Sequence, residues 1–319
     1  MTQTPTLKIG FVGSGHIARV HAQALHALGG AEIIAWSAQR RERALAAARD
    51  FGGEAMTTDA LLSHAGLEIA IITTPTPQHA EQAITAMTHG KQVFCEKPMA
   101  RTATQADDMI AAAARLQRKL FIGHTLRFFP IYQQARQLIL SGAVGNVRRV
   151  RCRRLNLSPA GRSPWFFDFE QSGGCILDLM IHDFDFLNWC FGAPTRVEVE
   201  TKPDKDPSGW RHAIVHLYFE NGVRAAAEGS WMHDRFEQSL KVEGDRGTLS
   251  TDFAGNLLRL EDKRGLRALE VLAADPYYDQ MKHYLQYVRG EANLIVTPQD
   301  ARAALGVALA GLRKLAINQ

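Results

Sequence analysis

The sequence has few cysteines, and no two of them lie close together. Cys95, Cys152, Cys175 and Cys190 are scattered through 319 residues, and each lies within or beside an apolar run. A disulfide framework, or a redox or zinc motif of the C-x-x-C type, would need paired spacings. We therefore expect reduced, mostly buried thiols and a protein that works in a reducing compartment, the cytoplasm.

Long apolar runs and an excess of one charge are also missing. Residues 1–6 carry neither the positive segment nor the apolar stretch of a secretory signal. No apolar run reaches the ~18 residues that cross a membrane. The sequence has 37 Lys and Arg and 33 Asp and Glu, so its formal net charge is only +4. We therefore expect neither a membrane nor a nucleic-acid partner.

The first part of the chain alternates strand patterns with helix patterns. Short apolar runs that read as strands occur at 7–12, 32–36, 68–73, 92–95 and 120–123. Helical spacing of apolar residues occurs between them, at 16–28, at 41–51, from the break at 74–77 to about 89, and at 104–117. Strands alternating with helices of this length predict βαβ units and a parallel sheet. Residues 1–124 are thus predicted to form a doubly wound, nucleotide-binding α/β domain of the Rossmann type.

The second part of the chain has a different pattern. Strands in series are predicted at 147–157, 211–220, 223–230, 236–243, 248–251 and 257–260, with the hairpin signal Asn221-Gly222 between two of them. Helices are predicted at 131–141, 173–191, 277–288 and 300–316. Residues 125–319 therefore read as an α+β domain built on an open sheet.

A glycine-rich turn joins the first strand to the first helix. It reads Gly13-Ser14-Gly15-His16-Ile17-Ala18 and matches G-x-G-x-x-G/A in the context that this motif requires. Gly13 allows the tight turn, Gly15 lets a pyrophosphate approach the backbone, and Ala18 lets helix and strand pack closely. The helix N-terminus would supply N–H donors to the phosphates. The alternative is a βα turn that binds no ligand.

The end of the second strand bears on which dinucleotide is bound. An acidic residue normally stands there to bond the ribose 2′-hydroxyl of NAD. Here the chain has Ser37, Arg40 and Arg41 and no acid. A hydroxyl and a guanidinium fork suit a 2′-phosphate, which favours NADP over NAD. Alternatively, both arginines are simply the solvated start of the second helix.

Two further motifs make the sequence distinctive. Glu96-Lys97-Pro98 follows the strand at 92–95, and G-G-x-x-x-D-x-x-x-H-x-x-D follows later, with Gly173, Gly174, Asp178, His182 and Asp185. Together they resemble the Gfo/Idh/MocA oxidoreductases, over nearly the whole chain. The resemblance implies a Rossmann domain, a second domain with an open, mainly antiparallel sheet, and oxidation or reduction of a sugar, cyclitol or related polyol. It also implies dimers or tetramers packed through that sheet.

Asp178, His182 and Asp185 share one face of the helix predicted at 173–191, because their spacing is i, i+4, i+7. That helix is apolar nearly all round, so ionisable groups on it are costly unless they are paired or functional. His182 suits the role of proton acceptor from a substrate hydroxyl. Lys97 can stabilise the developing alkoxide or relay the proton, and Asp178 can orient His182 or a substrate hydroxyl. The resemblance assigns the same broad roles.

This cluster has two alternative interpretations. Asp178 and His182 could be a buried pair that anchors the helix. They could also ligate zinc, but no Cys/His set with zinc spacing is present, so we predict no metal.

Several supporting positions are predicted with less specific signals. Thr73, Thr74 and Pro75 follow a strand on the cofactor side. His79 is either a cofactor contact or a surface residue, and Glu96 bonds the nicotinamide ribose or orients Lys97. Arg127, at the domain junction, is a candidate substrate contact. Trp165 could stack on a sugar ring, although such aromatic runs are more often core.

The sequence departs from the family pattern at two positions. Ser172 replaces the first glycine of a common triplet, and Ala38 aligns with the frequent acid after the second strand. The second departure supports NADP. We predict an NAD(P)-dependent sugar or polyol oxidoreductase. The alternatives are a glycoside hydrolase that uses transient oxidation with a retained NAD, and a ligand-sensing regulator on the same fold.

Overall fold

The computed structural model describes residues 6–159, 163–201, 206 and 208–317. The chain forms two compact units. Unit 1 comprises residues 1–125 and 275–302, and unit 2 comprises residues 126–274 and 303–319. The segment 275–302, which the sequence analysis counted with the second domain, therefore groups with the first. Within the described ranges, no helix is long and apolar enough to span a membrane.

Unit 1 contains a six-stranded parallel sheet, which confirms the predicted Rossmann architecture. The strands are β1 (Leu7–Val12), β2 (Ala31–Ser37), β3 (Glu54–Ala55), β4 (Ile69–Ile72), β5 (Gln92–Cys95) and β6 (Leu120–Ile122). Their order in the sheet is β3-β2-β1-β4-β5-β6. The direction of winding reverses between β1 and β4, and in open α/β sheets ligands bind at such a point, outside the carboxyl ends of the strands.

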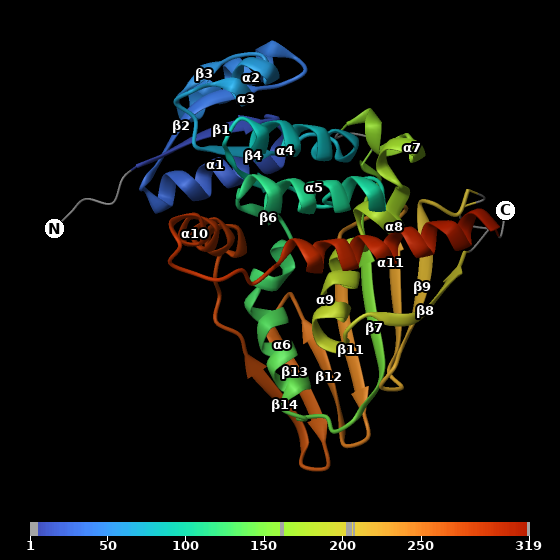
Figure 1. The fold of residues 1–319 in the computed structure, drawn as a ribbon. Helices are drawn as coiled ribbons and strands as arrows, with labels where there is room; N and C mark the ends of the chain where they lie inside the picture. The colour runs from blue at the N-terminus through green and yellow to red at the C-terminus, as the bar shows by residue number, and fades with distance from the viewer. Residues whose placement is uncertain (1–5, 160–162, 202–205, 207, 318–319) are drawn as a thin grey trace. The chain divides into compact units, whose positions relative to one another are not determined.

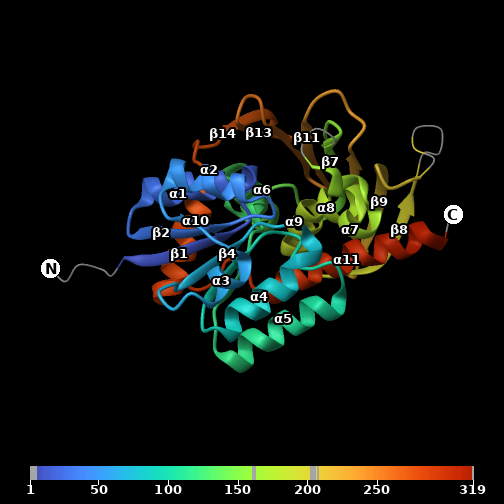
Figure 2. The ribbon, with the colours of Figure 1, turned by 90° about the horizontal axis from the view of Figure 1, so that it is seen from above.

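Helices cover both faces of this sheet. They are α1 (His16–Leu28), α2 (Arg41–Phe51), α3 (Thr58–Ser63), α4 (His79–Thr88), α5 (Ala103–Leu116) and α10 (Pro276–Arg289), with a short 3-10 turn η1 (Thr76–Gln78). Figure 2 shows α1 and α2 on one face and α3, α4 and α5 on the other, and α10 packs beside α1. The strands are buried on both faces, which is why they read as unbroken apolar runs.

Helix α10 belongs to unit 1 through specific contacts. The ring of Tyr284 packs edge-on against the rings of Phe94 and Phe121. The ammonium of Lys119 donates to the carbonyl of Val288 at 3.0 Å, and the hydroxyl of Thr125 donates to the Gln280 side chain at 3.1 Å. These bonds join the sheet to a helix more than 150 residues further along the chain.

Unit 2 contains an eight-stranded mixed sheet. The strands are β7 (Val147–Leu155), β8 (Pro194–Glu200), β9 (His212–Phe219), β10 (Arg224–Ser230), β11 (Glu237–Gly244), β12 (Gly247–Asp252), β13 (Leu257–Asp262) and β14 (Gly265–Glu270). Their order is β14-β13-β12-β11-β7-β10-β9-β8, and every pair is antiparallel except β7 with β10. The predicted open, mainly antiparallel sheet is confirmed, although β8 and β14 were not predicted as strands.

The two faces of this sheet have different characters. One face packs on α6 (Pro130–Leu140), α8 (Gly174–Asp178), α9 (Ile181–Phe191) and the later part of α11 (Pro298–Ile317), as Figure 1 shows. On β7 the side chains of Val150, Cys152 and Arg154 point to that helical face and are buried. Arg151 and Arg153 lie on the opposite face and are exposed, so the arginines of β7 divide between the two surfaces of the sheet. We call the second surface the open face.

The predicted single helix over 173–191 is wrong. The structure has α7 (Phe169–Ser172), α8 and α9, with a break at Leu179–Met180. The amides of Leu179 and Met180 both donate to the carbonyl of Cys175, at 3.1 and 2.9 Å, so the helical ladder does not continue in register. Met180 also fills the space over Gly229, where any side chain would collide with it. Apolar periodicity cannot detect this break because the break itself is apolar.

The cysteines are free thiols, as predicted. Three are buried and Cys190 is half-buried, where burial raises the pKa of its thiol to about 12.

Candidate functional site

The turn between β1 and α1 has room for a phosphate. Gly13 has a φ of +103°, and a side chain there would lie 2.6 Å from the hydroxyl of Thr73, so the position requires glycine. Gly15 is different, because a side chain built on it would meet no atom within 4 Å. Its backbone therefore borders open space at the start of α1.

Several hydrogen-bonding groups at this turn make no hydrogen bond to the described residues. The hydroxyl of Ser14 is buried and has no hydrogen-bond partner among the described residues. Helix α1 begins at His16 with no side-chain cap and no acid in its first turn, which leaves its first amides free to bind an anion. Ala18 is fully buried, as the close packing of helix and strand requires. The turn from Gly13 to Ala18 thus fits a dinucleotide pyrophosphate.

The end of β2 carries basic and hydroxyl groups. Ser37 is buried, and its hydroxyl accepts a hydrogen bond from Thr58 at 3.2 Å. Arg40 is the N-cap of α2 and Arg41 its first residue, and both are exposed. Their guanidinium groups make no ion pair within the part of the chain that the structure describes. Between Ser37 and Arg41 there is no carboxylate to bond a ribose 2′-hydroxyl.

The loop after β4 is tied to the loop after β5 by His79. One ring nitrogen, Nε2, lies 2.7 Å from the carbonyl oxygen of Thr74, and the other, Nδ1, lies 2.8 Å from that of Pro98. Burial lowers the pKa of His79, and the two carbonyl acceptors oppose this effect. The hydroxyl of Thr73 donates to the carbonyl of Val12 at 3.1 Å. The predicted residues Thr73, Thr74, Pro75 and His79 therefore lie together at the carboxyl end of the sheet.

Glu96 lies beneath Lys97 and is paired with a histidine that the sequence analysis missed. Its Oε1 lies 2.7 Å from Nε2 of His21, and its Oε2 accepts from the backbone amide of Lys97 at 3.1 Å. Burial alone would raise the pKa of Glu96, but the hydrogen bond and charge of His21, with Lys97 nearby, hold it below its ordinary value. The side chain of Glu96 therefore binds the backbone amide of Lys97. The peptide bond between Lys97 and Pro98 is cis.

In unit 2, Asp178 and His182 flank the break in the helix. Asp178 is the last residue of α8, His182 is the second residue of α9, and both are half-buried. Gly174 begins α8 with a φ of +64°, and a side chain there would collide with the carbonyl of Trp210. Ser172, where a glycine was expected, accepts the amide of Gly174 on its hydroxyl at 3.1 Å. The local structure thus brings two of the three predicted catalytic residues to one turn.

Two other carboxylates of α9 are buried against arginines. Asp183 accepts from Nε and Nη2 of Arg154 at 2.9 and 2.8 Å. Asp185 accepts from Nε and Nη2 of Arg127 at 2.9 and 2.7 Å. Tyr132 completes the first cluster, since its hydroxyl accepts from Arg154 at 3.2 Å. Arg127, predicted to contact substrate, therefore has its guanidinium fork engaged by a carboxylate.

Trp165 lies in an aromatic cluster. It belongs to the 3-10 turn η4 (Pro164–Phe167), is half-buried, and stacks on Phe166 with ring centroids 4.2 Å apart. Phe166 in turn contacts Trp231 edge-on at 5.9 Å. The cluster uses one face of the Trp165 ring.

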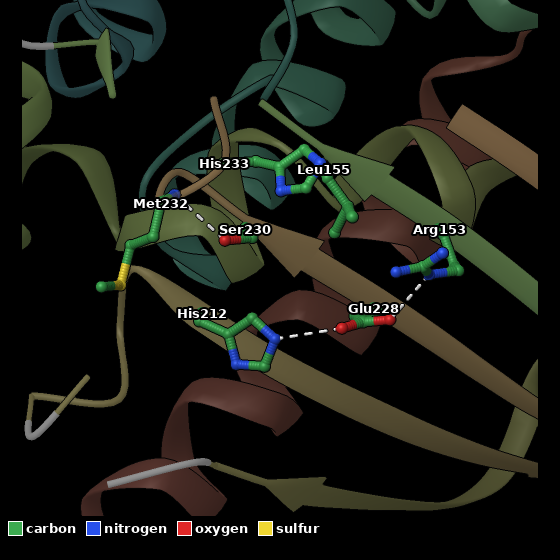
Figure 3. A pocket seen from close by; sticks show the side chains of 7 residues that line it. All are labelled: Arg153, Leu155, His212, Glu228, Ser230, Met232 and His233. Atoms are coloured by element: carbon green, nitrogen blue, oxygen red, sulfur yellow. Dashed lines mark hydrogen bonds and ion pairs between the residues drawn. The ribbon is translucent and has the colours of Figure 1, made fainter. Parts of the chain in front are cut away.

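A pocket of about 400 Å³ opens on the open face of unit 2 (Figure 3). It is lined by side chains of β7, β9, β10 and the turn that follows β10, namely Arg153, Leu155, His212, Glu228, Ser230, Met232 and His233. The Glu228 carboxylate bridges Nε of Arg153 at 2.9 Å and Nε2 of His212 at 3.1 Å. None of these residues was predicted, because three separate strands supply them and no local motif marks them.

The described residues contain no cluster of three or more His, Cys, Asp or Glu side chains that could hold a metal ion.

The parallel sheet order, the glycine turn and the uncapped start of α1 together fit a domain that binds a dinucleotide. Residues 7–124 match the oxidoreductase family with an NAD-binding Rossmann fold, and residues 132–250 match the GFO/IDH/MocA C-terminal domain. The chain belongs to the GFO/IDH/MocA family and is an NAD(P)-dependent oxidoreductase.

Relatives of known name cover between 83% and 98% of the chain. The inositol 2-dehydrogenase of Rhizobium meliloti is 25% identical over 98% of this chain and 97% of its own length. The D-apiose dehydrogenase of Paraburkholderia graminis is 30% identical over 83% of this chain and 72% of its own. The structure of UDP-N-acetylglucosamine 3-dehydrogenase from Acidithiobacillus ferrooxidans is 26% identical, covers 97% of this chain and 99% of its own, and superposes with a TM-score of 0.82.

Proposed function

We propose that this protein is an NADP-preferring oxidoreductase that acts on a hydroxyl or keto carbon of a sugar, cyclitol or related polyol. The named relatives act on inositol, apiose and a nucleotide sugar, which supports the substrate class. The observation that carries the cofactor preference is the end of β2, where Arg40 and Arg41 are exposed and no acid stands. The free thiols favour a cytoplasmic location.

The residues have distinct roles in this proposal. The turn from Gly13 to Ala18 binds the pyrophosphate, Ser37, Arg40 and Arg41 bind the 2′-phosphate, and the loop after β4 lies beside the nicotinamide. When bound, the nicotinamide exchanges a hydride with the substrate carbon. His182 accepts the proton of the substrate hydroxyl, and Asp178 orients it. Lys97 donates a hydrogen bond to the substrate oxygen and stabilises its negative charge.

A titration with NADPH and NADH tests the cofactor preference. The wild-type chain is expected to bind NADPH more tightly, and Ala38→Asp is expected to reverse the order by repelling the 2′-phosphate. Arg40→Ala should weaken NADPH alone by about tenfold to a hundredfold, the worth of one charge-assisted hydrogen bond of about 1.5–3 kcal/mol. Arg43→Ala, an exposed arginine in the same helix, is the matched control. Tighter NADH binding by the wild type would overturn the preference.

A panel of polyols, aldoses and glycosides tests the reaction. Net reduction of free NADP by a polyol supports the proposal, and it should be lost in Lys97→Ala and His182→Ala while NADPH binding persists. Cleavage of a glycoside with retained NAD would identify the hydrolase instead. A cellular function that survives Lys97→Ala would identify a ligand-sensing regulator. Full turnover in His182→Ala would remove the assigned proton acceptor.

We also propose a homodimer or homotetramer that packs through the open face of unit 2. That face carries half-exposed side chains such as Ile214 and Tyr218 on β9, unlike the buried opposite face. Sedimentation of Ile214→Glu should show a smaller species than the wild type. An unchanged mass would place the contact elsewhere.

A further inference from the structure

The main chain at Lys97 is held from both sides by buried side chains. We propose that His21, acting through Glu96, and His79 are positioning residues that fix the backbone of Lys97. This inference rests on the proposed function, in which Lys97 contacts substrate. It differs from the expectation that His79 contacts the cofactor, and of the two roles expected for Glu96 it takes the orientation of Lys97 and not the bond to the ribose.

The first hold acts on the peptide group before Lys97. The Oε2 of Glu96 accepts from the Lys97 amide at 3.1 Å, while the Glu96 amide donates to the carbonyl of Ile72 in β4 at 2.9 Å. The side chain and the backbone of Glu96 therefore tie the amide of Lys97 to the sheet. Burial makes an ionised carboxylate costly here, and a partner for the second oxygen of Glu96 offsets that cost.

His21 supplies that second contact. The ring is fully buried, packs edge-on against Phe94 and Tyr277, and has Nε2 at 2.7 Å from Oε1 of Glu96. A carboxylate oxygen can only accept, so Nε2 carries the hydrogen. Nδ1 has no partner among the described residues. Among the described residues of unit 1, the ring therefore makes its one hydrogen bond to Glu96. We infer that His21 holds the Glu96 carboxylate in place.

The second hold acts on the residue after Lys97. His79 is 1% exposed, with Nδ1 at 2.8 Å from the carbonyl oxygen of Pro98 and Nε2 at 2.7 Å from that of Thr74. The ring therefore links the loop after β5 to the loop after β4. A neutral ring can donate to one of the two carbonyls, and the protonated ring can donate to both.

The consequence for Lys97 follows from geometry. Its ammonium acts at the end of a four-carbon side chain, and every rotamer of that chain moves with the backbone, so the ammonium can be placed accurately only if the backbone is fixed. A displacement of about 1 Å at a reacting group can lower the rate about a hundredfold. Loss of either hold should therefore lower kcat and leave the binding of NADPH nearly unchanged.

Conservative variants can separate the two ring nitrogens. The side-chain amide nitrogen of Asn occupies the place of a histidine Nδ1, and that of Gln the place of Nε2. For His79, Asn keeps the contact with Pro98, so His79→Asn should retain kcat within a few-fold, while His79→Gln should lose roughly a hundredfold. For His21 the order reverses, because Nε2 makes the contact. There His21→Gln should retain kcat and His21→Asn should lose it.

The controls distinguish positioning from other roles. His89, an exposed histidine that follows α4, gives the matched variant His89→Asn, which should change nothing. If His79 instead contacts the cofactor, both His79 variants will raise the Kd for NADPH before they lower kcat. Equal losses in the Asn and Gln variants of both histidines, at unchanged NADPH affinity, would overturn the proposal.

Hydrogen exchange reads the first hold without any turnover. The Lys97 amide, protected by Glu96, should exchange at least tenfold faster in His21→Asn than in the wild type, and at the wild-type rate in His21→Gln. If no polyol is oxidised by the wild type, the proposed reaction fails but this exchange pattern still stands. Unchanged exchange in His21→Asn would overturn the positioning role by itself.

Discussion

Buried basic side chains contact different partners in the two units. In unit 1, His79 contacts two carbonyl oxygens, and the ammonium of Lys91 donates to those of His64 and Leu67 at 2.7 and 2.9 Å. In unit 2, the buried cations Arg127 and Arg154 instead form two-bond forks with carboxylates of α9. These two basic side chains of unit 1 hold main chain, and these two cations of unit 2 hold a helix by ion pairs.

This difference matches what each unit must keep in place. Loops after parallel strands have unpaired backbone groups, so a side chain that contacts carbonyls fixes the path of the loop. A helix satisfies most of its backbone hydrogen bonds internally, so α9 is oriented chiefly through its side chains. A buried ion pair does this with a defined geometry, because the guanidinium fork matches the carboxylate in one plane.

The largest effect is expected from breaking an ion pair of unit 2. Arg127→Ala should lower the free energy of unfolding by about 3–5 kcal/mol, because it leaves the fully buried Asp185 carboxylate without its partner. Urea denaturation measures this loss. Unchanged stability with a raised KM for polyol would show instead that Arg127 serves the substrate. The double variant Arg127→Met, Asp185→Leu should recover most of the lost stability, because no lone charge remains.

A smaller loss is expected from the corresponding change in unit 1. Burial lowers the pKa of Lys91, and its ammonium satisfies two carbonyls of the turn before β4. Lys91→Met keeps the length of the side chain and removes both bonds, which should lower stability by about 1–3 kcal/mol. Amide exchange near residues 64–67 should rise. If Lys91→Met matched Arg127→Ala, the contrast between the units would be lost.

The pH dependence of stability should come in part from unit 1. The pKa of Glu96 is held below its ordinary value, so its contribution is complete above the ordinary carboxyl pKa and is lost as pH falls through the lowered value. The pKa of His79 is also lowered, so its contribution is present above the ordinary imidazole pKa and is lost on acidification. Melting temperature should therefore fall as pH is lowered from 7 to 3, and below the ordinary carboxyl pKa the fall should be less steep in Glu96→Gln. Identical slopes would contradict this assignment.

The smallest effect is expected from breaking an exposed ion pair of unit 1. It tests whether the loss of stability depends on burial of the pair and not on the pairing alone. Arg302 makes a two-bond fork with Asp107 at 2.7 and 3.1 Å, similar in geometry to that of Arg127, but Asp107 is exposed. Arg302→Ala should leave the urea midpoint within experimental error, because exposed pairs are screened by water. A loss as large as that of Arg127→Ala would mean that the fork itself stabilises the fold.

Sequence patterns predicted most elements because their signals are local. Strands β1 and β5, the turn at Gly13 and the helix at 16–28 follow from runs and spacings within a few residues. Strand β14 was missed since it is an edge strand with exposed side chains and no apolar alternation. The break at Leu179–Met180 was missed because its residues are themselves apolar, so the apolar pattern runs through it without interruption.

For the candidate site, too, the sequence predicts residues that belong to local motifs and misses partners that are distant along the chain. Glu96 and Lys97 form a motif that sequence can recognise, and Asp178 and His182 form another. His21 is 75 residues from Glu96, and Arg127 is 58 residues from Asp185, so nothing local announces either pairing. Charge on an apolar helix signals that partners exist, and only the fold identifies them.

The return of residues 275–302 to unit 1 limits how the chain can be cut and recombined. A fragment ending at residue 124 would keep all six strands but lose α10, leaving the rings of Phe94 and Phe121 uncovered on that side and Lys119 without its carbonyl acceptors. A chimera that exchanges nucleotide specificity must transplant both segments or neither. The donor chain then has three junctions to match, at residues 125, 274 and 302.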